Sequence, residues 1–389
     1  MSTIEEKIAR LDRGLKKLVT YPIKRAISAI YAPKNLLSGV HEDVKVHEVR
    51  IDDRPYQVVN VRNGRIFTDR SGNVSVMSRR SLVPAVSWQY NPDGAAALPD
   101  IENHLLTQKL LLDRFPWRIQ GTVVSLLTGG GANNNYFHWL YDALPRLYIA
   151  KTILNLDENT QYLIPEETYS FQKETLDLLG IPVGARISSK ECQHLRATNT
   201  IATSHPNLDE GAPEWVVKFL RESLGGGVAN TIAERLIYIS RGDSKRGRRL
   251  LNEDYLRTLL ESVGFSTYRL SELTVSQQIS LFSQAKMIVG THGAGFSNLA
   301  FASRGAIVYE LFSDRYQPDL DGKANPKDKA DMYERVSRIV GLEYHRIVCS
   351  AVRGDNSNWL ENNIADFHIS ERDSIAILKH AERITTGHT

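Results

Sequence analysis

The segment 285–312, AKMIVGTHGAGFSNLAFASRGAIVYELF, restricts the possible folds of this chain more than any other segment. It reads as an apolar strand at 287–289, a glycine-rich turn, a short helix and a second apolar strand that ends in Glu310. A strand, a helix and a further strand in succession are typical of a parallel sheet with crossover connections. The turn leaves backbone N–H groups at a helix start, where a phosphate can accept them, and the carboxylate of Glu310 can reach a ribose. The segment therefore predicts a nucleotide site within an α/β domain.

The turn itself differs from the dinucleotide fingerprint. It reads GTHGAGFSN, so that Asn298 stands where the third glycine of that fingerprint would be. Gly290 ends the strand, while Gly293 and Gly295 permit close approach of the backbone to a ligand. His292 could donate a hydrogen bond to a phosphate or pair with the other domain, although a lone histidine in a turn is more often purely structural. The turn thus favours a nucleotide other than NAD.

Strand-length and helix-length patterns alternate along most of the chain after Val123. In the first block, helices are expected at 136–153, 169–179 and 214–224. Before it, short apolar runs separated by turn dipeptides predict a small antiparallel β region. The second block starts with a strand at 235–241, and helices are expected at 252–263, 272–285 and 371–384. This alternation predicts α/β domains built on parallel sheets.

The length of the chain indicates two domains, because 389 residues exceed one ordinary hydrophobic core. The glycine run at 225–227 is the best candidate for the linker. Two such domains would face a central cleft at the carboxyl ends of their strands. The expected divisions are a helical segment at 1–32, a first domain at 33–226, a second domain at 227–350 and a C-terminal segment at 351–389 whose helix packs back on the first domain.

Composition excludes several classes of protein. A hydrophobic content of 42% and a charged content of 24% are those of a soluble globular protein. The net charge of +3 does not indicate a general nucleic-acid binder. Cys192 and Cys349 stand alone, so neither a disulfide framework nor a thiolate metal site is expected. No apolar run approaches the ~18 residues of a membrane span. These observations favour a cytoplasmic protein.

The first 32 residues predict a basic amphipathic helix. Its apolar stripe is Ile4, Ile8, Leu11, Leu15 and Leu18, and lysine and arginine outnumber acidic residues around it. Such a helix can lie on an anionic membrane surface. The more ordinary interpretation, which we favour, is docking on the same protein or on a second subunit, so a homo-oligomer is left open.

In the first block, the stretch 133–146 carries the best candidate for acid–base chemistry. His138 and Asp142 are four residues apart and share one face of the expected helix, and Arg146 continues that row. A carboxylate beside an imidazole orients it and raises its basicity, as a general base requires. Asn135, near the helix start, could donate into the cleft. The alternative is a packed or solvated polar face without catalytic function.

In the second block, the stretch 239–252 carries a concentration of positive charge. Arg241 stands at the end of the expected strand, and Lys245, Arg246, Arg248 and Arg249 follow it. Beside a phosphate-binding turn, such groups could neutralise a diphosphate. The alternative is a solvated charge run or a patch that faces a membrane. Asp319-Leu320-Asp321 is the only plausible acidic metal motif, and we interpret it as chance, so no metal is expected.

Taken together, the motifs at 135–147, 235–241, 288–299 and 309–312 resemble glycosyltransferase family 61. The resemblance covers about residues 120–350. It implies a GT-B architecture, in which two Rossmann-like domains face each other. It also implies inversion at the anomeric carbon, no obligatory metal and no cofactor. The first domain would then bind the acceptor, and the second would bind the nucleotide-sugar.

The resemblance also implies roles for individual residues. Glu310 would hold the ribose of the donor, and Asn298 would lie beside the diphosphate. The diphosphate itself would be met by Arg241, Lys245, His292, Gly293, Ala294 and Gly295. On the acceptor side would lie His138, Asp142, Asn135 and Arg146. Either Asp142 or His138 would act as the base, and the sequence does not separate them.

The expected function is transfer of a sugar from a nucleotide-sugar, with a UDP-sugar favoured, to a glycan or lipid-linked glycan. Family members of the bacterial type act in surface polysaccharide biosynthesis (capsule or lipopolysaccharide), so we expect a cytoplasmic protein that lies peripherally on the inner face of the plasma membrane. One alternative is an NAD-dependent enzyme that modifies nucleotide-sugars. Another is a non-catalytic glycan-binding member of an assembly complex. The sequence indicates neither the sugar, nor the acceptor, nor the linkage.

Overall fold

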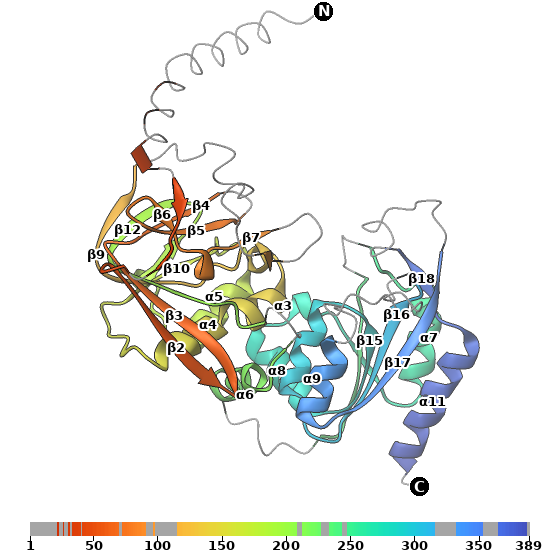
Figure 1. Cartoon of the computed structure of the whole chain (residues 1–389). Coiled ribbons are helices and arrows are strands. Elements are labelled where there is room, and N and C mark those ends of the chain that lie inside the picture. The colour runs from red at the N-terminus through yellow and green to blue at the C-terminus, as the bar shows by residue number, and fades with distance from the viewer. Residues whose placement is uncertain are drawn as a thin grey trace, which may run out of the picture. The chain divides into compact units, whose positions relative to one another are not determined.

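The computed structural model describes residues 33–39, 41–69, 72–90, 115–207, 212–226, 233–242, 247–315, 332–352 and 365–386, with a few isolated positions besides. These residues form two compact units. The first comprises Met1–Thr168 and Ile181–Pro206, and the second comprises Tyr169–Gly180 and Asn207–Thr389. Each unit has a large sheet of its own (Figure 1). Both units mix helices and strands, as the alternating sequence pattern predicts.

The parallel part of the first sheet has four strands: β9 (Trp117–Ser125), β10 (Gln161–Ile164), β11 (Arg186–Ser188) and β12 (His194–Thr203). Their order is β12-β9-β10-β11, and every neighbouring pair is parallel. Read across the sheet from β11 to β12, the strands come third (β11), second (β10), first (β9) and fourth (β12) in the order of the chain. The direction of strand addition therefore reverses between β9 and β12. Such a reversal is a topological switch point, and doubly wound sheets bind ligands beside it at the carboxyl ends of the strands.

The antiparallel β region expected near the N-terminus extends this sheet beyond β12. Its strands are β2 (Val44–Ile51), β3 (Arg54–Arg62), β4 (Arg65–Thr68), β5 (Val74–Ser78) and β6 (Ser81–Leu82). Both β3 and β4 pair with β12, while β1 (Asn35–Leu36) lies parallel to β6. A separate hairpin pairs β7 (Gln89–Tyr90) with β8 (Ala96–Ala97). Buried valines and leucines of both regions form one core, which joins the antiparallel strands to the parallel ones.

The helix expected at 136–153 is present but divided. It consists of α3 (Tyr136–His138), a π-helical turn (Trp139–Ala143) and α4 (Pro145–Lys151). Pro145 explains the division, because it has no N–H and its ring would clash with the carbonyl of the preceding turn. The wider turn avoids this clash, and Leu144 donates its N–H to the carbonyl of Trp139, five residues back. Such π turns occur frequently at functional sites.

The second sheet contains β13 (Arg235–Ile239), β14 (Ser266–Tyr268), β15 (Ala285–Thr291), β16 (Ile307–Ser313), β17 (Glu343–Ala351) and β18 (Phe367–His368). The order is β14-β13-β15-β16-β17-β18, and only the last pair is antiparallel. Along the chain, the five parallel strands stand second, first, third, fourth and fifth. This is a flavodoxin-like order, and its switch point lies between β13 and β15.

The second unit contains the helices expected at 169–179, 214–224, 252–263, 272–285 and 371–384, although the sequence analysis places the first two within the first domain, and it adds an unexpected helix at 332–340. They are α5 (Ser170–Leu178), α6 (Glu214–Leu224), α7 (Glu253–Glu261), α8 (Val275–Ser283), α9 (Met332–Val340) and α11 (Glu371–Thr386). The helix expected at 272–285 begins later, because Thr274 caps α8 in a capping box with Gln277. The segment after the glycine turn is a 3₁₀ stretch, Ala294–Phe301.

The position of α11 corrects one expectation from the sequence. The sequence predicts that this helix packs on the first domain, but Ile377 and Ala381 are fully buried in the core of the second sheet. They lie four residues apart on one helix face, and α7 packs against the helix (Figure 1). Lys286 of β15 also donates to the carbonyl of Ile384 at 2.8 Å. The apolar stripe of α11 thus completes the second unit.

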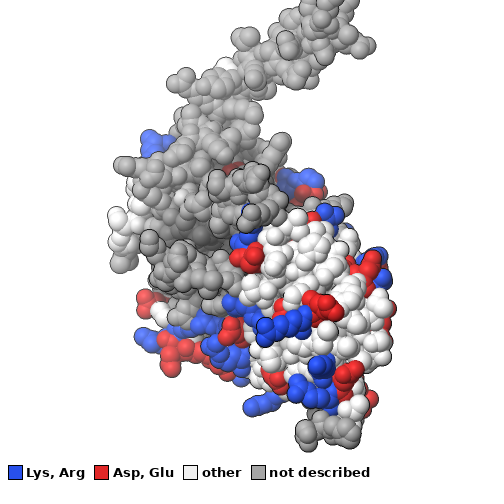
Figure 2. Space-filling model, turned by 90° about the vertical axis from the view of Figure 1, so that its right-hand side faces the viewer, with Lys and Arg blue, Asp and Glu red and all other residues white. Residues whose placement is uncertain are grey.

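Several expectations fall outside the described residues. They concern the amphipathic stripe within 1–32, Lys245, the complete glycine run at 225–227, and the Asp319-Leu320-Asp321 motif. No helix in the described part of the chain is long and apolar enough to cross a bilayer. Cys192 and Cys349 are both buried and form no disulfide. Figure 2 shows acidic and basic side chains interspersed on the face it displays, so this face carries no extended field of one sign.

Candidate functional site

The switch point of the first sheet carries the expected His138–Asp142 pair. The chain leaves β9 through a glycine turn, in which Gly129 and Gly130 have φ values of 81° and 108°, and then enters α3. The Nδ1 atom of His138 lies 2.6 Å from Oδ2 of Asp142. The side chain of Asp142 is 6% exposed and that of His138 is 20% exposed. The carboxylate is therefore the inner member of the pair, and the imidazole is the outer member.

His205 joins this pair from the other strand of the switch point. It follows the carboxyl end of β12, and its Nε2 lies 3.8 Å from Oδ2 of Asp142. Burial lowers the pKa of His205 to about 4, although Asp142 acts in the opposite direction. The second imidazole is therefore neutral at physiological pH. Sequence reasoning missed His205, because nothing near 205 signals a contact with residue 142.

Arg146 and Asn135 support the His138–Asp142 pair. The guanidinium of Arg146 is buried, donates to the carbonyl of Asp142 at 3.1 Å, and donates to that of Thr203 at 2.9 Å. It thereby ties α4 to the end of β12. Burial lowers the pKa of Arg146 to about 10, so it remains charged at neutral pH. The side chain of Asn135 accepts the N–H of Phe137 at 2.9 Å and caps α3. Both were expected on the acceptor side, and in this structure both hold the helix in place.

The switch point of the second sheet carries Arg241 and the glycine turn. Arg241 follows β13 and donates from Nη1 to the carbonyl of His292 at 2.7 Å. Its guanidinium lies against Gly293, where an added Cβ would stand 1.6 Å from Nη1. In the first hydrogen bond of the 3₁₀ stretch, the N–H of Phe296 donates to the carbonyl of Gly293. The N–H groups of Ala294 and Gly295 lie before this bond, at the start of the stretch. Both residues are partly exposed, so their N–H groups and the arginine can meet an anion.

Beneath the turn lies a buried histidine–carboxylate pair. The Nδ1 atom of His292 is 2.6 Å from Oε1 of Glu310, and the hydroxyl of Tyr344 donates to Oε2 at 2.6 Å. Glu310 is 0% exposed. The ring of His292 stacks on Phe312 at 4.5 Å between centroids. Both carboxylate oxygens are therefore engaged within the unit.

Burial dominates the protonation of this pair. It raises the pKa of the Glu310 carboxyl to about 8, against the opposing effects of the Tyr344 hydrogen bond and Arg346. It also lowers the pKa of His292 well below its usual value, and Arg248 and Arg241 act in the same direction. A low-dielectric interior disfavours both charged forms. The pair therefore presents a neutral imidazole beneath a turn surrounded by arginines.

The side chain of Asn298 supports the glycine turn from inside the second unit. Its side-chain amide is fully buried and donates to Oε1 of Gln278 at 2.8 Å and to the carbonyl of Gly295 at 3.1 Å. It thereby fixes the end of the glycine turn to α8. The structure thus brings Arg241, Asn298 and Glu310 to the glycine turn.

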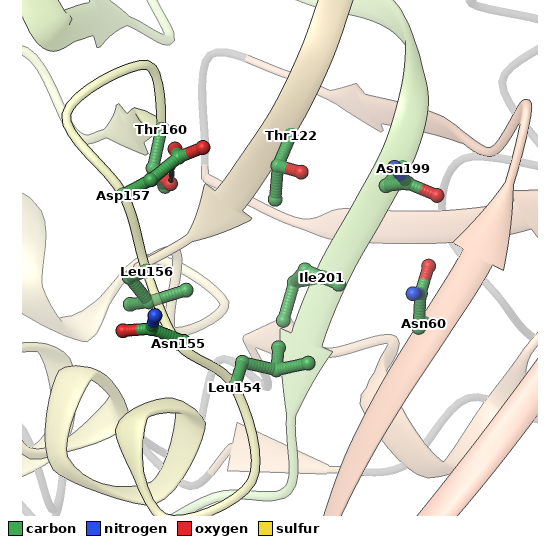
Figure 3. Close-up of a pocket in the computed structure, with 9 residues that line it drawn as sticks. All are labelled: Asn60, Thr122, Leu154, Asn155, Leu156, Asp157, Thr160, Asn199 and Ile201. Carbon is green, nitrogen blue, oxygen red and sulfur yellow. Dashed lines mark hydrogen bonds between the residues drawn. The ribbon is translucent and has the colours of Figure 1, made fainter.

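A shallow pocket of about 100 Å³ lies elsewhere in the first unit (Figure 3). It is lined by Asn60, Thr122, Leu154, Asn155, Leu156, Asp157, Thr160, Asn199 and Ile201. Thr160 immediately precedes β10, so the pocket lies beside the start of that strand, whereas His138 and His205 follow the carboxyl ends of β9 and β12. None of the expected site residues lines it. We therefore place the candidate site at the switch points and not in this pocket.

The two largely parallel sheets define the chain as an α/β protein, with imidazole, carboxylate and guanidinium groups at the carboxyl ends of its strands, where such sheets bind ligands. Residues 136–309 match the family model described as Glycosyltransferase 61. The chain therefore contains a glycosyltransferase family 61 domain, which makes it a glycosyltransferase with a sugar donor and an acceptor as substrates. The match spans His138, Asp142, His205, Arg241 and His292. No curated protein matches the chain significantly.

Proposed function

We propose that this protein is an inverting glycosyltransferase that transfers a sugar from a nucleotide-sugar to a hydroxyl of a glycan without a metal ion. One observation carries the proposal: the two switch points differ in chemistry. The first carries an imidazole–carboxylate pair that can accept a proton, and the second carries a guanidinium and backbone N–H groups that can bind a diphosphate. Direct displacement requires both functions, because the acceptor loses a proton while negative charge develops on the leaving nucleotide.

On the acceptor side, we assign the role of base to Nε2 of His138. Asp142 binds Nδ1 and is nearly buried, so it orients the ring and fixes the proton on Nδ1. The structure gives Nε2 no hydrogen-bond partner within the described part of the chain. The outer imidazole is therefore better placed for an acceptor hydroxyl than the inner carboxylate. Asp142 would stabilise the imidazolium that forms when His138 takes the proton.

On the donor side, we assign the diphosphate to Arg241 and the N–H groups of Ala294 and Gly295, with Lys245 added as in the sequence-based prediction. A guanidinium binds a phosphate through two parallel hydrogen bonds, and N–H groups at a helix start add fixed dipoles. These groups would stabilise the charge of the leaving nucleotide in place of a metal.

Glu310 receives a different role in this proposal from the one expected. With one oxygen on His292 and the other on Tyr344, its carboxylate reaches a ribose only by giving up one of these partners. We therefore propose that Glu310 positions His292. The backbone carbonyl of His292, which accepts the hydrogen bond from Arg241, is thereby held in place. Asn298 likewise positions the turn.

We further propose a GT-B arrangement, in which the two units, divided near residue 206 and not at 226, direct their switch points into one cleft. Two parallel α/β units, each with its polar groups at a switch point, support it. From the resemblance we retain a UDP-sugar as the favoured donor and a bacterial surface polysaccharide, or its lipid-linked precursor, as the acceptor. For the segment 1–32 we keep docking on protein as the favoured interpretation, and a contact with the inner face of the plasma membrane is the alternative that would bring the enzyme to a lipid-linked acceptor.

Nucleotide binding provides the first test. Calorimetry with UDP, GDP, CMP, dTDP and NAD should show binding of one nucleoside mono- or diphosphate, and Arg241→Ala should weaken it. Transfer from the matching α-linked donor should then give a β-linked product, as judged by the anomeric proton coupling in NMR spectra. Binding of NAD alone would contradict the proposal, and a product with retained configuration would contradict the single displacement.

A further inference from the structure

A cluster of two histidines and a glutamate lies away from both switch points. Within the described part of the chain, Glu343, His345 and His380 form the group whose ligand atoms all approach within 4.8 Å of one another. His345 Nε2 lies 2.7 Å from Oε1 of Glu343, and His380 Nε2 lies 4.0 Å from the same oxygen. We propose that these three side chains bind a divalent transition-metal ion, with zinc as the best match, and thereby fasten α11 to β17.

Strand geometry directs two of the ligands to one side. Glu343 and His345 are two residues apart on β17, so their side chains leave the same face of the sheet. His380 comes from α11, which packs on the second sheet's core through Ile377 and Ala381. The cluster is open to solvent, since the side chain of Glu343 is 52% exposed and that of His345 is 36% exposed. A hydrated ion can therefore enter without any rearrangement of the core.

Tyr309 prepares the cluster for a metal. It stands directly opposite His345 in the sheet, and the two rings stack with centroids 4.5 Å apart. Its hydroxyl lies 2.8 Å from Nδ1 of His380. With the proton on Nδ1, this hydrogen bond leaves Nε2 of His380 as a lone-pair donor toward Glu343 and His345. Histidine ligands of metals are commonly oriented in this way by a partner on the other ring nitrogen.

The dimensions of the cluster fit zinc after small side-chain rotations. Tetrahedral zinc with bonds of about 2.1 Å places neighbouring ligand atoms about 3.4 Å apart. Oε1 of Glu343 lies 2.7 Å from Nε2 of His345 and 4.0 Å from Nε2 of His380, and these two distances lie on either side of this value. Binding displaces the proton that Nε2 of His345 shares with Glu343, and water completes the coordination. Arg383, on the same helix, adds positive charge near His380, so we expect weaker binding than at a closed four-ligand site.

The site is separate from the proposed transfer chemistry. Tyr309 and Glu310 are consecutive in β16, so their side chains leave opposite faces of the sheet. The same holds for Tyr344 and His345, which are consecutive in β17. The metal ligands therefore lie on the face that α11 covers, and the His292–Glu310 pair lies on the other. This geometry assigns the ion a structural role, which does not depend on the proposed reaction.

Zinc titration of the full chain, produced without a polyhistidine tag and freed of metal by a chelator, tests the proposal. Calorimetry should show one zinc ion per chain, and His345→Ala or His380→Ala should weaken binding by more than about tenfold. Tyr309→Phe should weaken it by about tenfold with unchanged stoichiometry, because only the orienting hydrogen bond is lost. His368→Ala is the matched control, since His368 is an exposed histidine of the same unit.

Thermal unfolding supplies a second measurement. Zinc should raise the unfolding midpoint of the wild type and of His368→Ala but not that of His345→Ala, and magnesium should raise neither because imidazole ligands favour softer ions. Should a histidine variant fail to fold, Glu343→Gln serves instead, because its side chain is exposed and the change leaves its shape intact. The absence of zinc binding by the wild type, or unchanged affinity in Glu343→Gln and both histidine variants, would overturn the proposal.

Discussion

Replacement of Asp142 by Asn probes the assignment of the base most directly. The wild-type carboxylate accepts Nδ1–H of His138 at 2.6 Å and is almost excluded from water. An amide of the same shape can turn its NH₂ group toward Nδ1, which moves the imidazole proton to Nε2 and removes the lone pair that the acceptor hydroxyl needs. General-base catalysis contributes about 10²- to 10⁴-fold to a rate, and loss of an orienting carboxylate costs toward the upper part of this range. We expect kcat to fall about 10³-fold, which corresponds to about 4 kcal/mol.

The assay is initial-rate turnover with the donor saturating, after thermal unfolding has shown that the variant is folded. Asp157→Asn is the matched control, because its carboxylate accepts a hydrogen bond from Thr160 in the same unit but lies away from the switch point. His138→Gln should lose at least as much activity as Asp142→Asn if the imidazole is the base. The double variant should be no worse than His138→Gln, because the two residues act as a unit.

Three outcomes would refute this reasoning. Near-normal kcat in both single variants would remove the pair from catalysis. Losses that add in the double variant would show that the two side chains act independently. A much larger loss in Asp142→Asn than in His138→Gln would make the carboxylate the base.

Three further predictions concern binding and pH. Arg241→Ala should weaken nucleotide binding by about 10- to 100-fold in calorimetry. Gly293→Ala should also weaken it, because the added Cβ displaces the guanidinium of Arg241. Unchanged affinity in both variants would contradict the donor assignment. Since the pKa of His205 is lowered from 6.5 to about 4, unfolding takes up an extra proton between these values, so stability falls by about 3 kcal/mol as the pH drops through this window. In denaturant titrations, His205→Gln should show a shallower decline, and an unchanged slope would contradict it. The pKa of Glu310 is raised from 4.5 to about 8, so its contribution to the stability of the fold is lost as the pH rises through that interval. Glu310→Gln should therefore gain stability relative to the wild type from pH 5 to pH 8. A loss of stability relative to the wild type over this range would show that the Glu310 carboxyl is ionised in the folded protein.

Much of the fold could be predicted from local pattern. The alternation of strands and helices gave both α/β units, because hydrophobic periodicity and turn residues act within a few positions of one another. The strand orders were not predictable in this way, since they depend on pairings between distant segments. The placement of α11 failed for the same reason, because its apolar stripe does not specify which sheet it covers.

The candidate site was predictable where its residues are close in sequence. His138 and Asp142 are linked by helix periodicity, and Arg241 stands at the end of a recognisable strand. His205 and Tyr344 have no such local link to their partners. The proposed role of Glu310 shows a different limit, because a carboxylate at a strand end suggests a ligand contact whether it faces solvent or the hydroxyl of a partly buried tyrosine. The cluster of Glu343, His345 and His380 escaped notice because one ligand comes from a separate helix.

The protonation states at the two switch points support the division of chemistry between them. If His205 were charged, it would compete with His138 for the carboxylate of Asp142 and would disfavour a second positive charge on His138. Burial keeps His205 neutral, so it adds no positive charge beside the His138–Asp142 pair in the proposed mechanism. In the second unit, burial keeps His292 neutral, with Arg248 and Arg241 acting in the same direction, so the positive charge that we propose to meet an anion comes from guanidinium groups and not from this imidazole. In each unit a buried, neutral imidazole thus lies beside the residues to which we assign the chemistry.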